Sequence, residues 1–245
     1  VEDIKGAAYT GHVNQVPDSL VPVSTAGTVA NGKLLMYKGS IGANPTTGAQ
    51  ILSAEATVEQ AGATGDFIAF DVFLLTSAQT QLYLTQDAGV TSSASKGLEN
   101  AARLAFLIEG NVANGATADA IALTGATSAI IWEPNNNAHT TSGIANAANN
   151  YGISIDATSV VANYQGLNAI IPVAANVPLN SSDTTYFQTV TPTIKTGTAP
   201  TGTSTLFTIN AGITKVRIYA WVEGQDVDCE NDASGTDVTF NIKFT

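Results

Sequence analysis

Acidic side chains recur at every second position near the C-terminal end of this sequence, a spacing suited to holding a divalent cation. They lie in the segment Asp226-Val227-Asp228-Cys229-Glu230-Asn231-Asp232, and Asp237 follows eleven residues after Asp226. The pattern imitates positions 1, 3, 5, 7 and 12 of an EF-hand calcium loop, although Asn231 replaces the usual glycine and Asp237 the usual glutamate. The predicted calcium ligands are Asp226, Asp228, Glu230, Asp232 and Asp237. The alternative is a solvated acidic loop that binds no ion.

Signatures of catalysis are missing from the sequence. The two histidines, His12 and His139, do not form an H-E-x-x-H motif, and the sequence lacks a nucleophile elbow, a Walker A loop and a dinucleotide-binding glycine pattern. Cys229 is the single cysteine, which excludes a disulfide within the chain and favours a small buried side chain. We therefore predict no enzyme activity, no catalytic residues and no cofactor other than the calcium considered above.

Two polar segments have competing interpretations. Residues 132–141, Trp-Glu-Pro-Asn-Asn-Asn-Ala-His-Thr-Thr, could form a sugar-binding loop with an aromatic platform. The favoured interpretation is a strand end whose Trp132 lies in the core, followed by an asparagine-rich turn. Asn180-Ser181-Ser182 matches a glycosylation sequon, which matters only in a host that glycosylates.

The charge balance limits the partners. Only 12% of the 245 residues are charged, and 20 acidic against 9 basic residues give a formal net charge of −11. Such a chain is repelled by nucleic acid and by anionic membranes. The sequence also lacks an apolar run of the ~18 residues that a spanning helix needs. We expect no nucleic-acid partner and no membrane span, and a neutral Thr, Ser and Asn surface typical of repetitive extracellular or capsid-like assemblies.

Alternating and short apolar runs separated by turn residues predict an all-β fold, a jelly-roll-like antiparallel β-sandwich. The predicted strands cover residues 33–41, 49–58, 66–76, 81–85, 128–132, 167–173, 206–209, 215–222 and 237–244. Residues 24–245 form one domain in this interpretation, with an elaboration over residues 133–205, and residues 1–23 form an N-terminal extension.

Details of the strands allow sharper expectations. In residues 215–222, the side chains expected to point inward are Val216, Ile218, Ala220 and Val222. This strand is expected to pair with residues 237–244 as a hairpin around the acidic loop. Residues 96–108 predict a short turn that leads into a strand. Residues 144–149 are a further helix candidate.

The sequence predicts that the N-terminal segment forms an extended arm. Ala7, Tyr9, Gly11 and Val13 share one face of an alternating pattern that ends before Pro17. Such an arm can insert into the unfinished sheet of a neighbouring subunit or serve as the first strand of its own domain. Residue 1 is Val rather than Met, which favours a mature product from which a targeting peptide was removed.

Several segments together resemble secreted filament-forming proteins of the TasA and camelysin type. The resemblance is carried by residues 66–74, 81–85, 97–106, 131–135 and 219–229. It implies a jelly-roll subunit exported to the cell surface and linked to its neighbours by donor strands, with Ala7, Tyr9, Gly11 and Val13 as the donated face. A camelysin-like protease activity is not transferred, because a matching set of metal ligands is not found.

The favoured function is therefore a structural subunit of an extracellular filament or biofilm-matrix fibre that polymerises by donor-strand complementation. Its main partner is expected to be a further copy of the same chain, with neighbouring filaments or the cell surface as others. The alternatives are a viral capsid, decoration or tail protein, and a calcium-dependent adhesin or carbohydrate-binding module.

Overall fold

The described part of the chain is built mostly of β-strands, as predicted. The computed structural model describes residues 13–25, 27–43, 50–60, 64–94, 96–116, 121, 125–135, 138–151, 165–167, 187–189, 194–195 and 205–245. Two α-helices accompany the strands there, α1 (Leu98–Ala101) and α2 (Thr141–Tyr151). The fold is all-β; the more specific jelly-roll arrangement stays a prediction.

Five of the strands in the described residues have eight or more residues, and the strands range in length from two residues to eleven. In chain order they are β1 (Asn14–Gln15), β2 (Val29–Ala30), β3 (Lys33–Leu34), β4 (Met36–Ala43), β5 (Gln50–Thr57), β6 (Ile68–Thr76), β7 (Thr80–Tyr83), β8 (Gly89–Ser92), β9 (Ala102–Val112), β10 (Ile130–Glu133), β11 (Gln165–Leu167), β12 (Phe187–Thr189), β13 (Ile194–Lys195), β14 (Thr205–Ile209), β15 (Gly212–Val222) and β16 (Val238–Asn241).

A six-stranded sheet with the order β1-β6-β15-β9-β10-β13 forms the centre of the molecule. Its strands are antiparallel except for the β10–β13 pair. β15 pairs along most of its length with β6 on one side and with β9 on the other. This central place explains why ten of its eleven residues are buried.

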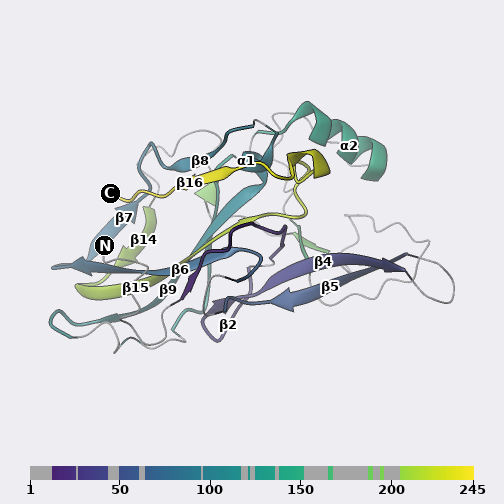
Figure 1. The fold of residues 1–245 in the computed structure, drawn as a ribbon. Helices are drawn as coiled ribbons and strands as arrows, with labels where there is room; N and C mark the ends of the chain where they lie inside the picture. Colours follow the sequence, from purple (N-terminus) through teal and green to yellow (C-terminus); the bar gives the residue numbers. More distant parts are fainter. Residues whose placement is uncertain are drawn as a thin grey trace.

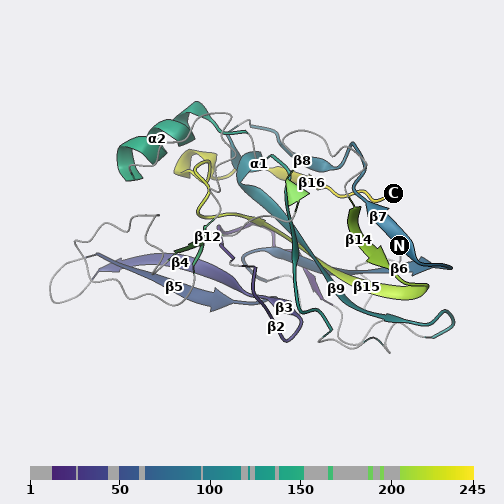
Figure 2. The ribbon, with the colours of Figure 1, turned by 180° about the vertical axis from the view of Figure 1, so that it is seen from behind.

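Both faces of the sheet are covered, as Figures 1 and 2 show. The pairs β7–β14 and β8–β16 lie over one face, while β2, β3 and the long β4–β5 hairpin lie toward the other. On β15, Val216, Ile218 and Ala220 belong to the first core, under β7, β8, β14 and β16. Tyr219 and Trp221 belong to the second core, so the face opposite the predicted inward one is also buried.

The predicted hairpin between residues 215–222 and 237–244 is wrong. β15 is fully flanked by β6 and β9, and β16 pairs instead with β8, with Phe240 opposite Val90. Neighbouring strands in sequence pair only about two-thirds of the time. Here the longer partners, β6 and β9, offer β15 more ladder hydrogen bonds than the four residues of β16 can.

Other local expectations are confirmed. α1 is a single turn that leads directly into β9, and α2 contains the predicted helical residues 144–149. Trp132 is fully buried at the end of β10. β11 overlaps the predicted strand 167–173 only at Leu167, and the rest of that strand lies outside the described residues. Most of the predicted elaboration and Asn180 lie outside them as well.

Phe106 is the centre of an aromatic group in the first core. It is fully buried, and its ring lies 6.2 Å from Phe207 and 5.9 Å from Phe244 between centroids. We expect Phe106→Ala to lower the free energy of unfolding by about 3–5 kcal/mol, because it leaves a cavity between β9, β14 and the C-terminal segment. Urea denaturation followed by circular dichroism measures this. Leu75→Ala, at a side chain that is 65% exposed, is the control and should change the value by less than ~0.5 kcal/mol.

Candidate functional site

Two groups of buried charged residues lie at the second-core side of the central sheet. The Arg103 cluster consists of Arg103, Glu133, Asp226, Asp228 and His139. The Arg217 cluster consists of Arg217, Lys215, Asp71, Glu59 and Glu109. Every side chain in the two clusters that forms an ion pair is at most 4% exposed. Because an unpaired charge at such depth costs several kcal/mol, each group must be paired by other parts of the chain.

Arg103 joins the ends of three strands. Its Nη2 lies 2.5 Å from Glu133 Oε1 at the end of β10 and 2.6 Å from Asp226 Oδ2 beyond the end of β15. Its Nη1 donates to the carbonyl oxygens of Asn100 and Ala102 at 2.6 and 3.0 Å. The guanidinium therefore fixes the start of β9 and the acidic loop to each other.

Asp228 closes the N-terminal end of α2. Its Oδ1 accepts hydrogen bonds from the backbone N and the Oγ1 of Thr140, at 2.9 and 2.6 Å, and Thr140 Oγ1 in turn accepts from Gly143 N. This is the arrangement of an N-cap, reinforced by a carboxylate at the positive end of the helix. A β-carbon on Gly143 would lie 2.5 Å from Asp228 Oδ1, so only glycine fits there.

The other oxygen of Asp228 binds His139. The Nδ1 of His139 lies 3.0 Å from Asp228 Oδ2, which also accepts a hydrogen bond from Asn100 Nδ2 at 3.1 Å. Burial alone would lower the pKa of His139, but the bond to Asp228 and the charge of Asp226 raise it above its usual value. Burial likewise opposes the lowered pKa of Asp228, and the bonds from His139 and Thr140 outweigh it.

The structure brings together two of the five predicted calcium ligands. Within the described residues, Asp226, Asp228 and His139 are the one group whose ligand atoms lie within 4.8 Å of one another. Glu230 is half-buried, and Asp232 and Asp237 are exposed. Each carboxylate oxygen of Asp226 and Asp228 accepts a hydrogen bond from the protein. The two carboxylates thus belong to a network of hydrogen bonds and ion pairs within the chain. Calcium binding stays a prediction from the sequence.

We expect Asp228→Asn to lower the free energy of unfolding by about 3 kcal/mol, because one partner of a buried ion pair is lost and the cap of α2 is weakened. Guanidinium denaturation at pH 6 measures the change. Asp232→Asn is the matched control in the same loop, since Asp232 is 55% exposed and makes a 3.7 Å contact with Lys96. An equal loss in both variants would contradict the network.

Glu223 ties the segment after the arm to the end of β15. It accepts hydrogen bonds from Ser24 Oγ, from Trp221 Nε1 at 3.2 Å and from Gln225 N at 3.2 Å. Beside it, Val23 N donates to Val222 O and Gly224 N donates to Val23 O. Burial raises the pKa of Glu223 to about 7, against the lowering effect of Ser24 and Arg103.

This pKa has a consequence for stability. A carboxyl group whose pKa rises from 4.5 to about 7 on folding stabilises the folded state fully below pH 4.5, and the contribution is lost as the pH rises through 7. We therefore expect Glu223→Gln to flatten the decline of the unfolding free energy between pH 4.5 and 7. Urea titrations at several pH values test this. A variant that keeps the slope of the unmodified protein would contradict it.

The Arg217 cluster centres on the carboxylate of Asp71. Arg217 Nε and Nη2 lie 2.8 and 3.2 Å from its two oxygens, and Lys215 Nζ lies 3.1 Å from Oδ2. Arg217 also reaches Glu59 Oε1, at 2.7 Å from Nη1. Burial opposes the charge of Arg217, but the bond to Asp71 and the surrounding carboxylates raise its pKa above the usual value.

The first described residues of the N-terminal arm dock on this cluster. Val13 N donates to Asp71 Oδ2 at 2.7 Å, and Asp71 N donates to Val13 O at 3.0 Å. Gln15 Nε2 donates to Phe67 O at 2.7 Å, and Gln60 N donates to Gln15 Oε1 at 2.8 Å. Val13, the fourth residue of the predicted donor face, thus lies against β6 of its own chain; Ala7, Tyr9 and Gly11 lie outside the described residues.

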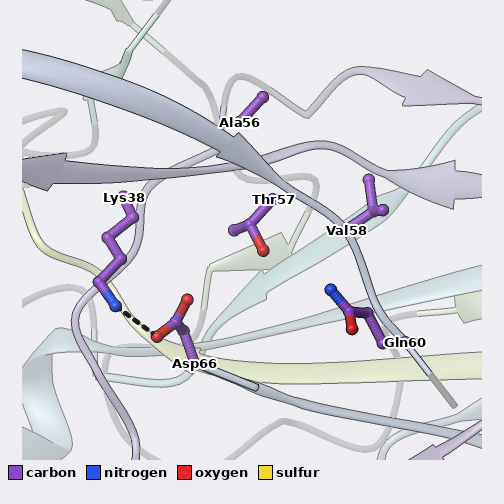
Figure 3. A pocket seen from close by; sticks show the side chains of 6 residues that line it. All are labelled: Lys38, Ala56, Thr57, Val58, Gln60 and Asp66. Carbon is purple, nitrogen blue, oxygen red and sulfur yellow. Dashed lines mark hydrogen bonds and ion pairs between the residues drawn. The ribbon is translucent and has the colours of Figure 1, made fainter. Parts of the chain in front are cut away.

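A pocket of about 280 Å³ lies near the docked arm, since Gln60, one of its lining residues, binds Gln15. Figure 3 shows the side chains that line it. It is lined by Lys38, Ala56, Thr57, Val58, Gln60 and Asp66. Figure 3 shows Lys38 and Asp66 pointing toward each other, with 2.7 Å between Nζ and Oδ1. Its polar lining and half-exposed ion pair differ from the apolar clefts that hold most small ligands.

Sequence reasoning did not identify Arg103, Arg217 or Lys215 as site residues. A signal was present, since each stands inside an otherwise apolar strand of a chain with few charges. Such positions indicate buried ion pairs, but the sequence does not say which carboxylates serve them. Cys229 is half-buried, and burial raises the pKa of its thiol to about 12, which suits a structural side chain.

None of the helices in the described residues has both the length and the apolar character needed to cross a membrane. The chain matches no protein-family model, and no curated protein or solved structure is significantly similar to it. The resemblance to the TasA and camelysin type therefore remains an expectation from the sequence.

Proposed function

We propose that this chain is a non-enzymatic structural subunit that joins adjacent copies through its N-terminal arm, in an extracellular filament or matrix fibre. The observation that carries the proposal is the docking of Val13–Gln15 on the edge of β6. Main-chain bonds, a buried glutamine and a charged anchor hold these three residues to strands that follow much later in the chain.

The contacts of the arm can be made equally well by another copy. Gln15 lies in the sheet, and the chain next joins the body at Val21, whose N donates to Asp66 O at 2.9 Å. The connection between them, residues 16–20, contains Pro17 and the 46% exposed Val16. Extending this short hinge exchanges the arm between copies while conserving each contact, which is the low-cost route of strand swapping.

The sheet edge has apolar surface for more of the arm. Asn14 pairs with Phe70 and Gln15 with Ala69, so a donated arm in the same register would place Tyr9 opposite Leu75. Leu75 is 65% exposed, which is unusual for a large apolar side chain on a strand. An aromatic side chain beside it would cover this surface, in agreement with Ala7, Tyr9, Gly11 and Val13 as the donated face.

Exchange of the arm can be measured with single cysteines placed on the two partner strands. In a Cys229→Ser background, Asn14→Cys and Phe70→Cys variants are purified separately, unfolded, mixed and refolded. We expect a disulfide-linked dimer, because Asn14 and Phe70 stand opposite each other in the ladder, within disulfide reach. The pair Gln15→Cys and Ala69→Cys repeats the test at the next position.

The matched control pairs Asn14→Cys with Thr239→Cys, an exposed position on β16, and should give no dimer. Deletion of residues 1–16 should abolish filaments in negative-stain electron microscopy. Filaments formed by the truncated protein, or a mixture that stays monomeric at both cysteine pairs, would reject arm exchange.

A further inference from the structure

The amine of Lys215 and the carboxyl group of Asp71 are close enough to form an amide bond with each other. They project from the neighbouring strands β15 and β6, where Lys215 pairs with Phe73 and is therefore diagonal to Asp71. Lys215 is 2% and Asp71 4% exposed, and the Nζ lies 3.1 Å from Oδ2. The ladder between β6 and β15, which is nine residues long, keeps Lys215 Nζ close to the carboxyl group of Asp71.

We propose that Lys215 and Asp71 form an intramolecular isopeptide bond between Nζ and Cγ, with Glu109 as the group that transfers protons. This modification goes beyond the proposed function and does not depend on arm exchange.

The fixed positions of the two side chains favour the reaction. An ammonium group is not a nucleophile, so a proton must first pass from Nζ to a neighbouring carboxylate of the cluster. The resulting amine is held next to the carboxyl carbon, and such fixed proximity replaces the entropy cost of an encounter.

The chemistry balances without any further reactant. The neutral Nζ attacks Cγ and forms the N–C bond, giving a tetrahedral intermediate. The C–Oδ1 bond then breaks, and Oδ1 leaves as water with two of the three protons that the ammonium carried. The third proton stays on the amide nitrogen. Oδ2 becomes the amide carbonyl and keeps the bonds from Val13 N at 2.7 Å and from Arg217 Nη2 at 3.2 Å, which also stabilise negative charge on that oxygen during the attack.

Glu109 suits the transfer of these protons. It is 1% exposed, and neither of its carboxyl oxygens has a hydrogen-bond partner, which is unusual at that depth. Its Oε1 lies 3.8 Å from Nη1 of Arg217. It is the extra residue of a β-bulge, because Lys215 pairs with Gly110 and Val216 with Ile108, and bulges often re-aim side chains at functional sites. Burial raises the pKa of Glu109 to about 7, so that it can both give and take a proton near neutral pH.

Mass spectrometry of the intact, denatured full-length chain tests the bond, because a salt bridge does not survive denaturation. We expect a mass lower than that of the sequence by one water, and a tryptic peptide in which Lys215 is joined to Asp71. Lys215→Arg should restore the full mass. Asp71→Asn should lose one ammonia instead of one water, a signature that only a bond at this residue produces.

Three further variants separate the role of Glu109 from a general effect on folding. Glu109→Gln should keep the circular dichroism spectrum of the fold and abolish the mass loss. Glu59→Gln, in the same cluster, and Lys243→Arg, in the exposed ion pair with Asp87, should both retain it. A folded native chain of full mass would overturn the proposal. Retention of the loss in Glu109→Gln would overturn the assignment of the proton-transfer group.

Discussion

Two buried guanidinium groups determine what can pack on the second-core side of the central sheet. Arg103 and Arg217 project from β9 and β15 among apolar side chains, and neither can be left without carboxylates there. The partners come from distant parts of the chain: Asp71 from β6, Glu59 from the segment after β5, and Asp226 from the loop after β15. These ion pairs therefore hold the segment after β5 and the loop after β15 against the central sheet.

The same ion pairs connect the fold to its proposed role. Val13, the first described residue of the arm, binds Asp71, which also pairs with Arg217 and Lys215, so the docking edge and the buried cluster share one carboxylate. At the opposite end, Asp228 uses the acidic loop to cap α2 rather than to present open oxygens. The acidic loop, whose composition resembles that of a calcium site, thus binds the start of α2 and Arg103 within the same chain.

The limits of the sequence-based predictions follow from these contacts. Alternation and turn residues were enough to predict the long strands, the turn before β9 and the buried Trp132, since those features depend on local pattern. The hairpin of β15 with β16 failed because strand pairing depends on competition among distant edges, which a local pattern does not contain. Asp226 and Asp228 were identified as functional candidates, but their partners Arg103 and His139 lie 123 and 89 residues away along the chain.

Arm exchange is the central claim, and electron cryo-microscopy of the assembled native chain tests it most directly. The density should be followed from Val21 back to Val13 in each subunit. The account predicts that it crosses to the adjacent copy and that Val13 meets the Asp71 of that copy. An assembly in which each arm returns to β6 of its own chain, with the subunits held by other surfaces, would contradict it.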